Sequence, residues 1–523
     1  MRSLSIPRLD FGLPRYRQSD STGALTLIGV ILAAAIGGLI VAIGGAKIGI
    51  GLIGALMVIA SFFIPLHVTF WVLVIATFVL VGPIQYFARI DKIFWLSYLV
   101  GFLLLARAIV AVLFASSGMR AKRRNITAIE ALVILAAVIL LASSAMNLSP
   151  ILQILLAAKE YFFLWGAWFV LIGGVVGARS LDRFWAWMPW FLLLQFPVVV
   201  YQHFFIASNR AGAASWDAVV GLFGGDPEGG GASGSMAMCA VIAIAFAITH
   251  WRRRLMPGWK VFMTGVLGMA TIMLAEVKVA IILIPLVIFM IYGAEIFRRP
   301  LRSLAMLCAG VIASVAVVAV YQMQFTTTAT KSGRSLDAYV IDAIEKNTQV
   351  DYVDPLTFQM GRIGALTFWW KEQRAEEPLQ LIIGNGIGAS RMGLFKGEVA
   401  QRYGFDIERS SAAIMLWDAG ILGLLALAGA LFAGARRAFR LARQSVVADE
   451  AAVLQALGVG LTIVLLTLPY GPDFIRVPQF QLFVILMLAR VTISSSPTCS
   501  RFKSPVPTSI KPKRAYSSSG AGL

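Results

Sequence analysis

The sequence predicts an all-α membrane protein, a polytopic bundle of about 14 transmembrane helices (12–14) with one large outer loop between late spans. Hydrophobic residues make up 59% of the 523 residues and charged residues only 14%, whereas soluble proteins are about half apolar and a quarter charged. Apolar segments of roughly 20 residues recur from Gly23 onward, and each can cross a hydrocarbon core of about 30 Å. Strands of an outer-membrane barrel would instead alternate over about 10 residues.

Fourteen apolar segments are the expected spans, with boundaries loose by several residues. They are 23–44, 48–64, 67–87, 95–116, 128–146, 155–177, 184–207, 234–250, 261–275, 278–295, 303–322, 411–434, 453–469 and 477–492. The polar segment before them lacks the apolar core and cleavage site of a removable signal peptide. The predicted parts are therefore a cytoplasmic N-terminal segment 1–22, a bundle 23–322, a large loop 323–410, three last spans 411–492 and a disordered tail 493–523.

Charge distribution predicts the orientation of these spans. With the N-terminus in the cytoplasm, well over half of the 45 Lys and Arg residues fall on cytoplasmic pieces, and the short outer connections carry few. Acidic and basic side chains nearly cancel in the loop 323–410, so the net charge of +19 belongs to the cytoplasmic face. Topology and attraction to anionic lipid account for that charge. Nucleic-acid binding is not expected, because no basic patch with groove-reading elements is present.

The large loop contains several short motifs in a fixed order. Residues 361–374 are expected to be helical, and Pro378 with the following glycines should break the chain. The run Gly384-Asn385-Gly386-Ile387-Gly388 lacks the spacing and the βαβ surroundings of a dinucleotide fingerprint. It predicts a tight turn that presents backbone N–H groups to an anion.

Ionisable side chains also lie within or beside the predicted spans. A charged side chain that faces lipid carries a large cost in free energy, so each of these side chains is expected to face the bundle interior or a water-filled cavity. Simpler alternatives are that neighbouring charges pair with each other, as Asp473 could with Arg476, or that Lys278 extends to the headgroups. The residues concerned are Arg107, Lys159, Glu160, Glu276, Lys278, Asp473 and Arg476.

A second outer connection, 208–235, is rich in glycine and contains Asp217. It is either a flexible connector or a backbone surface that approaches a ligand closely, as glycine permits. Separately, cationic side chains that converge at the outer leaflet with few compensating acids favour a lipid-linked phosphate or pyrophosphate as their ligand, because its oxygens accept bidentate guanidinium bonds. No His, Cys and carboxylate group has metal-site spacing, so neither a metal nor another cofactor is expected.

The order of the loop motifs resembles that of the bacterial O-antigen polymerase and O-antigen ligase superfamily of integral-membrane glycosyltransferases. Its members have 12 to 14 spans, a large periplasmic loop with a Gly-Arg followed by Trp, a Gly-x-Gly-x-Gly turn, and a re-entry helix with an acidic residue-x-Gly-x-x-Gly. The matching positions here are Gly361-Arg362, Trp369, 384–388 and 418–423. The resemblance covers most of the chain in architecture, but in residues only the region around the loop.

One departure favours a polymerase within this superfamily. In ligases the re-entry helix begins with a His-Asn pair whose His is taken as catalytic, whereas Arg409 and Ser410 stand here. The resemblance thus implies polymerisation of O-antigen or exopolysaccharide repeat units in the bacterial inner membrane. An O-antigen ligase is the alternative within the family. A lipid-linked oligosaccharide flippase or polysaccharide exporter is the alternative of another class, although transporters usually contain internal repeats and none is found here.

The resemblance implies a metal-independent, inverting transfer from a chain on undecaprenyl pyrophosphate to a hydroxyl of the next lipid-linked repeat unit, with a chain-length regulator and a flippase as possible partners. The predicted catalytic cations stabilise the leaving pyrophosphate. They are Arg362, Arg409 and Lys278. Asp406 and Glu408 are either the general base or surface ion-pair partners. The predicted substrate-binding residues are Arg391, Trp369, Trp370, Gly384, Gly386, Gly388 and Asp217; the Trp pair would stack on sugars or anchor the loop at the interface.

Overall fold

The computed structural model describes residues 64–113, 126–209, 218–228, 230–298, 349, 353, 358–376, 378–393 and 395–494. Two compact units are present, and the first, Met1–Pro65, lies almost wholly outside the described residues. Within the described part of Leu66–Leu523 the chain is helical, with isolated bridges in place of strands, such as the one between Gln359 and Asp406.

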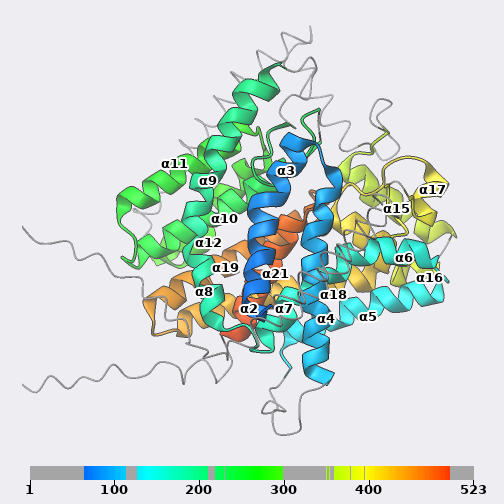
Figure 1. The fold of residues 1–523 in the computed structure, drawn as a ribbon, viewed down its shortest axis with the longest axis horizontal. Helices are drawn as coiled ribbons and strands as arrows, with labels where there is room; N and C mark the ends of the chain where they lie inside the picture. Colours follow the sequence, from blue (N-terminus) through cyan, green and yellow to red (C-terminus); the bar gives the residue numbers. More distant parts are fainter. Residues whose placement is uncertain are drawn as a thin grey trace, which may run out of the picture. The chain divides into compact units, whose positions relative to one another are not determined.

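The first half of the second unit runs from α2 to α12 (Figure 1). Its helices, including three π-helical segments, are α2 (Leu66–Ile75), η1 (Ala76–Leu80), α3 (Val81–Ala88), η2 (Asp91–Ile93), α4 (Phe94–Leu113), α5 (Ala128–Met146), α6 (Ile151–Ala158), η3 (Lys159–Phe163), α7 (Trp165–Ile172), α8 (Ala178–Ala186), α9 (Met188–Tyr201), η4 (Gln202–Ile206), η5 (Ala207–Asn209), α10 (Ser233–Arg252), α11 (Gly258–Leu274) and α12 (Val279–Arg298).

The second half supplies the loop region and the last helices. These are α15 (Arg362–Glu376), α16 (Pro378–Ile383), α17 (Glu398–Tyr403), α18 (Ser411–Gln444), α19 (Ala448–Thr467), α20 (Asp473–Arg476) and α21 (Pro478–Ile493). Helix α18 packs along α5 and α19, and Figure 1 shows α5 in cyan beside α18. The helix predicted over 361–374 is α15, and the predicted break at Pro378 is the start of α16.

Seven helices among the described residues are long and apolar enough to cross a membrane, and a pair bent by 42°, Ile151–Phe163 and Trp165–Ile172, makes an eighth. Several long apolar helices indicate a membrane protein. The expected fourteen spans are not reached: segments 23–44 and 303–322 and nearly all of 48–64 lie outside the described residues. Segments 261–275, 278–295 and 477–492 correspond to shorter apolar helices.

Local sequence explains where α5 begins and why α21 is central. Thr127 accepts a hydrogen bond from the Glu130 amide, and the Glu130 carboxylate accepts one from the Thr127 amide, which makes a capping box. Helix α21 is buried along its whole length, and it packs against α7, α18 and α19. A helix with apolar side chains on every side is stable in such a central position, and the few polar ones of α21 include Gln481, which bonds to the Glu160 carbonyl.

The Gly-rich connection after η5 is packed among helices where it is described. Residues 218–225 are buried, and several of their backbone polar groups bond to side chains of neighbouring helices. Gln202 accepts hydrogen bonds from the Val220 and Gly221 amides, and Gln195 accepts one from Leu222. Irregular backbone at membrane depth is tolerated where protein buries it in this way. Asp217 lies outside the described residues.

The described part of the loop region has a small core of its own. Trp369, Ala389, Val399, Ile407, Leu416 and Trp417 form it. Because Leu416 and Trp417 belong to the first turns of α18, this core fixes the loop region to the start of that helix. Figure 1 shows α15, α16 and α17 gathered near the ends of α5, α6 and α18.

Candidate functional site

The site begins with an interruption in α18. Gly420 has φ 64° and ψ −168° inside the helix, a conformation that glycine adopts without a steric penalty. The interruption leaves carbonyl groups of the preceding turn available to the loop. The Asn385 amide donates to the Trp417 carbonyl at 2.8 Å, and the Gly386 amide donates to the Asp418 carbonyl at 3.0 Å. The glycine turn therefore packs directly on the broken helix.

The predicted anion at the glycine turn is a side chain of the protein. The Asp418 carboxylate accepts hydrogen bonds from the Gly388 amide at 2.7 Å and the Ser390 amide at 2.9 Å, and from the Tyr161 hydroxyl at 2.6 Å. Asp418 is 1% exposed. A buried carboxylate needs such donors, so Asp418 fixes the backbone immediately before Arg391.

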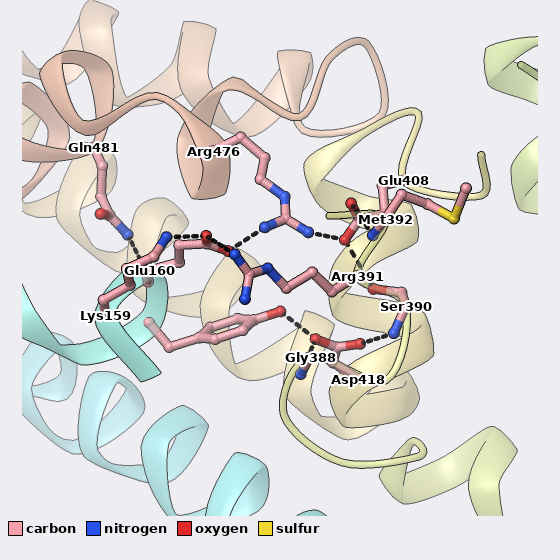
Figure 2. Close-up of polar contacts among 11 residues, drawn as sticks. Lys159, Glu160, Gly388, Ser390, Arg391, Met392, Glu408, Asp418, Arg476 and Gln481 are labelled. Atoms are coloured by element: carbon pink, nitrogen blue, oxygen red, sulfur yellow. Dashed lines mark hydrogen bonds and ion pairs between the residues drawn. The ribbon is translucent and has the colours of Figure 1, made fainter. Parts of the chain in front are cut away.

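Five charged side chains then meet in what we call the buried charge cluster: Lys159, Glu160, Arg391, Glu408 and Arg476. Glu160 lies at its centre (Figure 2). Its carboxylate forms ion pairs with Lys159 and Arg476, and Arg391 lies 3.9 Å away. The Glu160 side chain is 6% exposed. Since an uncompensated charge at this depth is costly, these ion pairs hold the helices in register.

Glu408 connects the same cluster to the loop. Its carboxylate pairs with Arg476 and accepts hydrogen bonds from the Met392 amide at 3.0 Å and the Ser390 hydroxyl at 3.4 Å. Figure 2 shows Arg391 reaching between Arg476 and Asp418 toward Glu160. The loop on both sides of Arg391 is thus tied down.

Lys159 and Glu160 point inward because they lie in a π-helical turn, η3. Such turns place extra side chains on one face and are frequent at functional sites. The Lys159 ammonium lies 4.8 Å from the Tyr98 ring centroid and 5.3 Å from that of Trp95. Gln481 of α21 donates a hydrogen bond to the Glu160 carbonyl, one of the groups at this turn. These contacts offset the cost of burying the lysine.

Among the five side chains of the cluster, cations outnumber carboxylates, and the neighbouring Asp418 carboxylate is engaged by Tyr161, Gly388 and Ser390. Three cationic side chains, Lys159, Arg391 and Arg476, face two carboxylates, Glu160 and Glu408. The Nη1 atom of Arg391 is buried without a hydrogen-bond partner. A native protein rarely leaves a buried guanidinium donor unused. The arrangement is suited to binding an anion with several oxygen atoms, which can accept from such a donor.

Arg409, Asp406 and Glu408 lie together, as their spacing suggested. Arg409 donates from Nε to the Met360 carbonyl at 2.9 Å, and its Nη1 lies 3.7 Å from the Asp406 carboxylate. Burial raises the pKa of Asp406, and the positive charges of Arg409 and Arg476 partly oppose that rise. Asp406 is thus at the rim of the cluster, whereas Glu408 is part of it.

Arg362 belongs to a neighbouring centre. Its guanidinium stacks on the Tyr470 ring at 4.3 Å, and its charge acts on Asp473. Asp473 accepts a 2.5 Å hydrogen bond from the Ser235 hydroxyl near the start of α10. Burial raises the pKa of Asp473, partly offset by Ser235 and Arg362. Asp473 and Arg476 therefore lie at opposite ends of α20 with different partners, rather than paired with each other.

The other predicted residues have different surroundings. Lys278 is exposed on the turn between α11 and α12 and is not a member of the cluster. Trp369 is 4% exposed and packs in the loop core, whereas Trp370 is 46% exposed. The three glycines form the turn on α18, and a Cβ at Gly386 would lie 2.1 Å from the Ser149 hydroxyl.

Sequence reasoning gave little weight to residues that the structure makes central. Lys159, Glu160 and Arg476 were noted as ionisable groups at span edges, but not as site residues. Asp418 was noted as a motif position only. The usable signal was an acid and a base adjacent to each other within an apolar segment, since such residues in membrane spans mark functional centres.

Comparison with known proteins adds no further assignment. A scan against models of protein families finds no match, and a search of curated proteins finds no relative. Among the described residues, no group of three or more His, Cys, Asp and Glu side chains could hold a metal ion.

Proposed function

We propose that the chain is a polysaccharide repeat-unit polymerase of the bacterial inner membrane. In this proposal it is an inverting glycosyltransferase, and its donor and acceptor are undecaprenyl-pyrophosphate-linked oligosaccharides at the periplasmic face. One observation carries the proposal. The buried charge cluster has an excess positive charge, and a donor of Arg391 is buried without a partner.

The chemistry of the transfer matches such a site. The acceptor hydroxyl attacks the anomeric carbon of the donor, and the bond from that carbon to the pyrophosphate oxygen breaks. Negative charge then develops on the leaving pyrophosphate. Arg391 and Arg476, held by Glu160 and Glu408, are preorganised donors for those oxygens, and such preorganisation is the main source of electrostatic catalysis. Lys159 adds charge from the other side of Glu160.

Asp406 is the better candidate for the general base. Glu408 already accepts hydrogen bonds from Met392 and Ser390 and pairs with Arg476. Asp406 is less engaged: it accepts a hydrogen bond from the Glu408 amide at 2.8 Å and lies 3.7 Å from Nη1 of Arg409. The carboxylate with fewer close donors is the better proton acceptor. Asp406 has a pKa raised by burial, which brings it closer to the value that a general base needs near neutral pH. In the proposed reaction it takes the proton of the acceptor hydroxyl.

The test is a deletion of the gene in its native host, followed by analysis of the lipid-linked glycans. The proposal expects single repeat units on undecaprenyl pyrophosphate in the periplasmic leaflet. The wild-type gene should restore polymer, and a variant with Arg391→Ala should not. Units that remain in the cytoplasmic leaflet would identify a flippase instead. Lipid-linked polymer that is never attached to its acceptor would identify a ligase.

A further inference from the structure

An apolar cavity of about 330 Å³ is lined in part by residues that neighbour members of the buried charge cluster in the chain. Its lining comes from α4, α5, the bent segment η3–α7, α18, α20 and α21. The volume lies near the lower end of the range for ligand pockets, about 300–1,000 Å³. Nearly all of its lining is hydrocarbon, so an apolar group is the favoured occupant.

The cavity leads from the outward face of the helices to the bundle interior. On the outward side, Val138 and Leu141 of α5 are each 54% exposed, and Phe169 of α7 is 37% exposed. At the inner side Met415 is 3% and Ile475 2% exposed. In a membrane-spanning bundle such an outward face meets lipid chains, so the cavity is open on the side from which a chain of the bilayer would enter.

The inner end of the cavity is lined by residues next to the buried charge cluster, and by none of its five members. Tyr161 and Ile475 line it, and they directly neighbour Glu160 and Arg476 in the chain. Gln481 also lines it, is 2% exposed, and bonds through its amide nitrogen to the Glu160 carbonyl. Its Oε1 atom is buried without a partner. A ligand here would have its hydrocarbon part among apolar side chains and a polar end toward Arg391.

We propose that this cavity holds the phosphate-proximal isoprene units of a polyprenyl phosphate or pyrophosphate, which enters sideways between α5 and α7. The inference rests on the proposed function for the identity of the lipid. The positive excess of the cluster complements the phosphate, and the apolar lining complements a single hydrocarbon chain. A phospholipid carries two chains on one headgroup, and a cavity of this volume accommodates part of one.

The probe is a polyprenyl phosphate with a photoreactive group on the isoprene unit nearest the phosphate. The full-length protein in nanodiscs of zwitterionic phospholipid is illuminated with this probe, and the cross-linked peptides are identified. The control probe is a phosphatidic acid with the photoreactive group in one acyl chain, which carries the same anionic headgroup chemistry on a different hydrocarbon part. We expect the prenyl probe to label residues 133–141 and 161–169, and the phosphatidic acid probe to label them far less.

Two variants of the same helix test the cavity itself. Ala137→Phe fills the cavity, since Ala137 lines it, whereas Ala142→Phe adds the same ring at an exposed position of α5 outside the lining. Losing burial of two methylene groups corresponds to about a tenfold weaker interaction. Labelling should therefore fall about tenfold or more in Ala137→Phe and stay at the wild-type level in Ala142→Phe. Ala137→Leu, a smaller change, should give an intermediate loss if Ala137→Phe fails to insert.

The outcomes separate this inference from the proposed function. Equal labelling by both lipids, or undiminished prenyl labelling in Ala137→Phe and Ala137→Leu, overturns the cavity assignment. Polymer formation at the wild-type level in a stably inserted Ala137→Phe variant also overturns it, and leaves the polymerase proposal intact. Prenyl-specific labelling that Ala137→Phe abolishes supports the cavity assignment, even if the deletion strain shows that the reaction is not polymerisation.

Discussion

The Tyr161 hydroxyl donates a 2.6 Å hydrogen bond to the carboxylate of Asp418, 257 residues later in the chain. This contact joins the π-helical turn that carries Glu160 to the segment that follows the glycine turn and leads to Arg391. Both turns deviate from regular structure, and each places a charged side chain in the cluster. Asp418 accordingly acts as a positioning residue: it orients Arg391 through the backbone and does not itself face the proposed substrate.

Replacing Asp418 tests this positioning role. In Asp418→Asn, one of the two backbone donors, Gly388 or Ser390, would face an amide NH₂ group in place of an oxygen. A buried donor left without its acceptor costs about 1–3 kcal/mol. Tyr161→Phe removes a single hydroxyl donor and should cost less. We expect polymer length and apparent melting temperature in detergent to fall below the wild-type values in both variants, and to fall further in Asp418→Asn than in Tyr161→Phe. Asp418→Asn should also have a lower substrate affinity than wild type. Equal behaviour of the two variants would contradict the role.

Arg391 is expected to be the most sensitive cation of the site. Arg391→Ala removes the guanidinium that has a free buried donor, and the rate should fall by roughly 10²-fold, as for the loss of an oxyanion-hole donor. Arg391→Lys keeps the charge but loses the planar fork, so it should rescue the rate only in part. The control is Arg374→Ala, which removes an exposed guanidinium stacked near Trp370. A polymerisation assay in proteoliposomes measures all three, and equal rates for Arg391→Ala and wild type would refute this assignment.

The helices of this protein were more predictable than its site. Periodic or continuous apolar segments give the existence of a helix, and α5 coincides with the segment expected over 128–146. The charged turn in 155–177 was located, but its π-helical form was not, since it depends on tertiary packing around Glu160. Helix α18 extends ten residues beyond the predicted end at 434, because Ala and Arg continue the helix outside the apolar stretch.

The partners of charged residues could not be predicted from spacing. Arg476 is near Asp473 in the chain, yet it pairs with Glu160, 316 residues away, while the equally buried Asp473 accepts a hydrogen bond from Ser235. The glycine turn was expected to present N–H groups to an anion, and among residues 384–388 only the Gly388 amide reaches one. That anion proved to be Asp418, which no local pattern connects with residues 384–388.

The central carboxylate of the cluster should be important for stability. Glu160→Gln leaves Lys159, Arg391 and Arg476 with a single remaining carboxylate, and removing one partner of a buried ion pair costs about 3–5 kcal/mol. The control is Glu228→Gln, which breaks an ion pair with Arg89 whose side chains are 66% and 69% exposed. Such a surface pair is worth about 0–1 kcal/mol. Thermal unfolding in detergent should separate the two variants clearly, and similar melting temperatures would argue against a tightly coupled cluster.

Close packing of the glycine turn on α18 can be tested apart from its backbone conformation. Gly384 and Gly404 have φ of 81° and 74°. A Cβ at Gly384 would lie 2.3 Å from the Ala419 nitrogen, whereas a Cβ at Gly404 has nothing within 4 Å. Gly404→Ala should therefore cost only the left-handed conformation, about 1–2 kcal/mol. Gly384→Ala should in addition displace the turn and abolish activity. Comparable stability and activity in both variants would show that the contact is easily relaxed.

The pH dependence of the reaction should report on Asp406. Burial raises its pKa above the ordinary value of about 3.9, and Arg409 is the first charge that opposes this rise. A general base acts in its ionised form, so activity should fall as pH drops through that raised pKa, at a higher pH than an unperturbed aspartate would give. Arg409→Gln removes the opposing charge and should move the acid limb further up. Asp406→Asn should lower the rate by about 10²–10⁴-fold, and the acid limb of the pH–rate profile should disappear. A normalised pH–rate profile of each variant measures this, and an acid limb that persists unchanged in Asp406→Asn would assign the base to another residue.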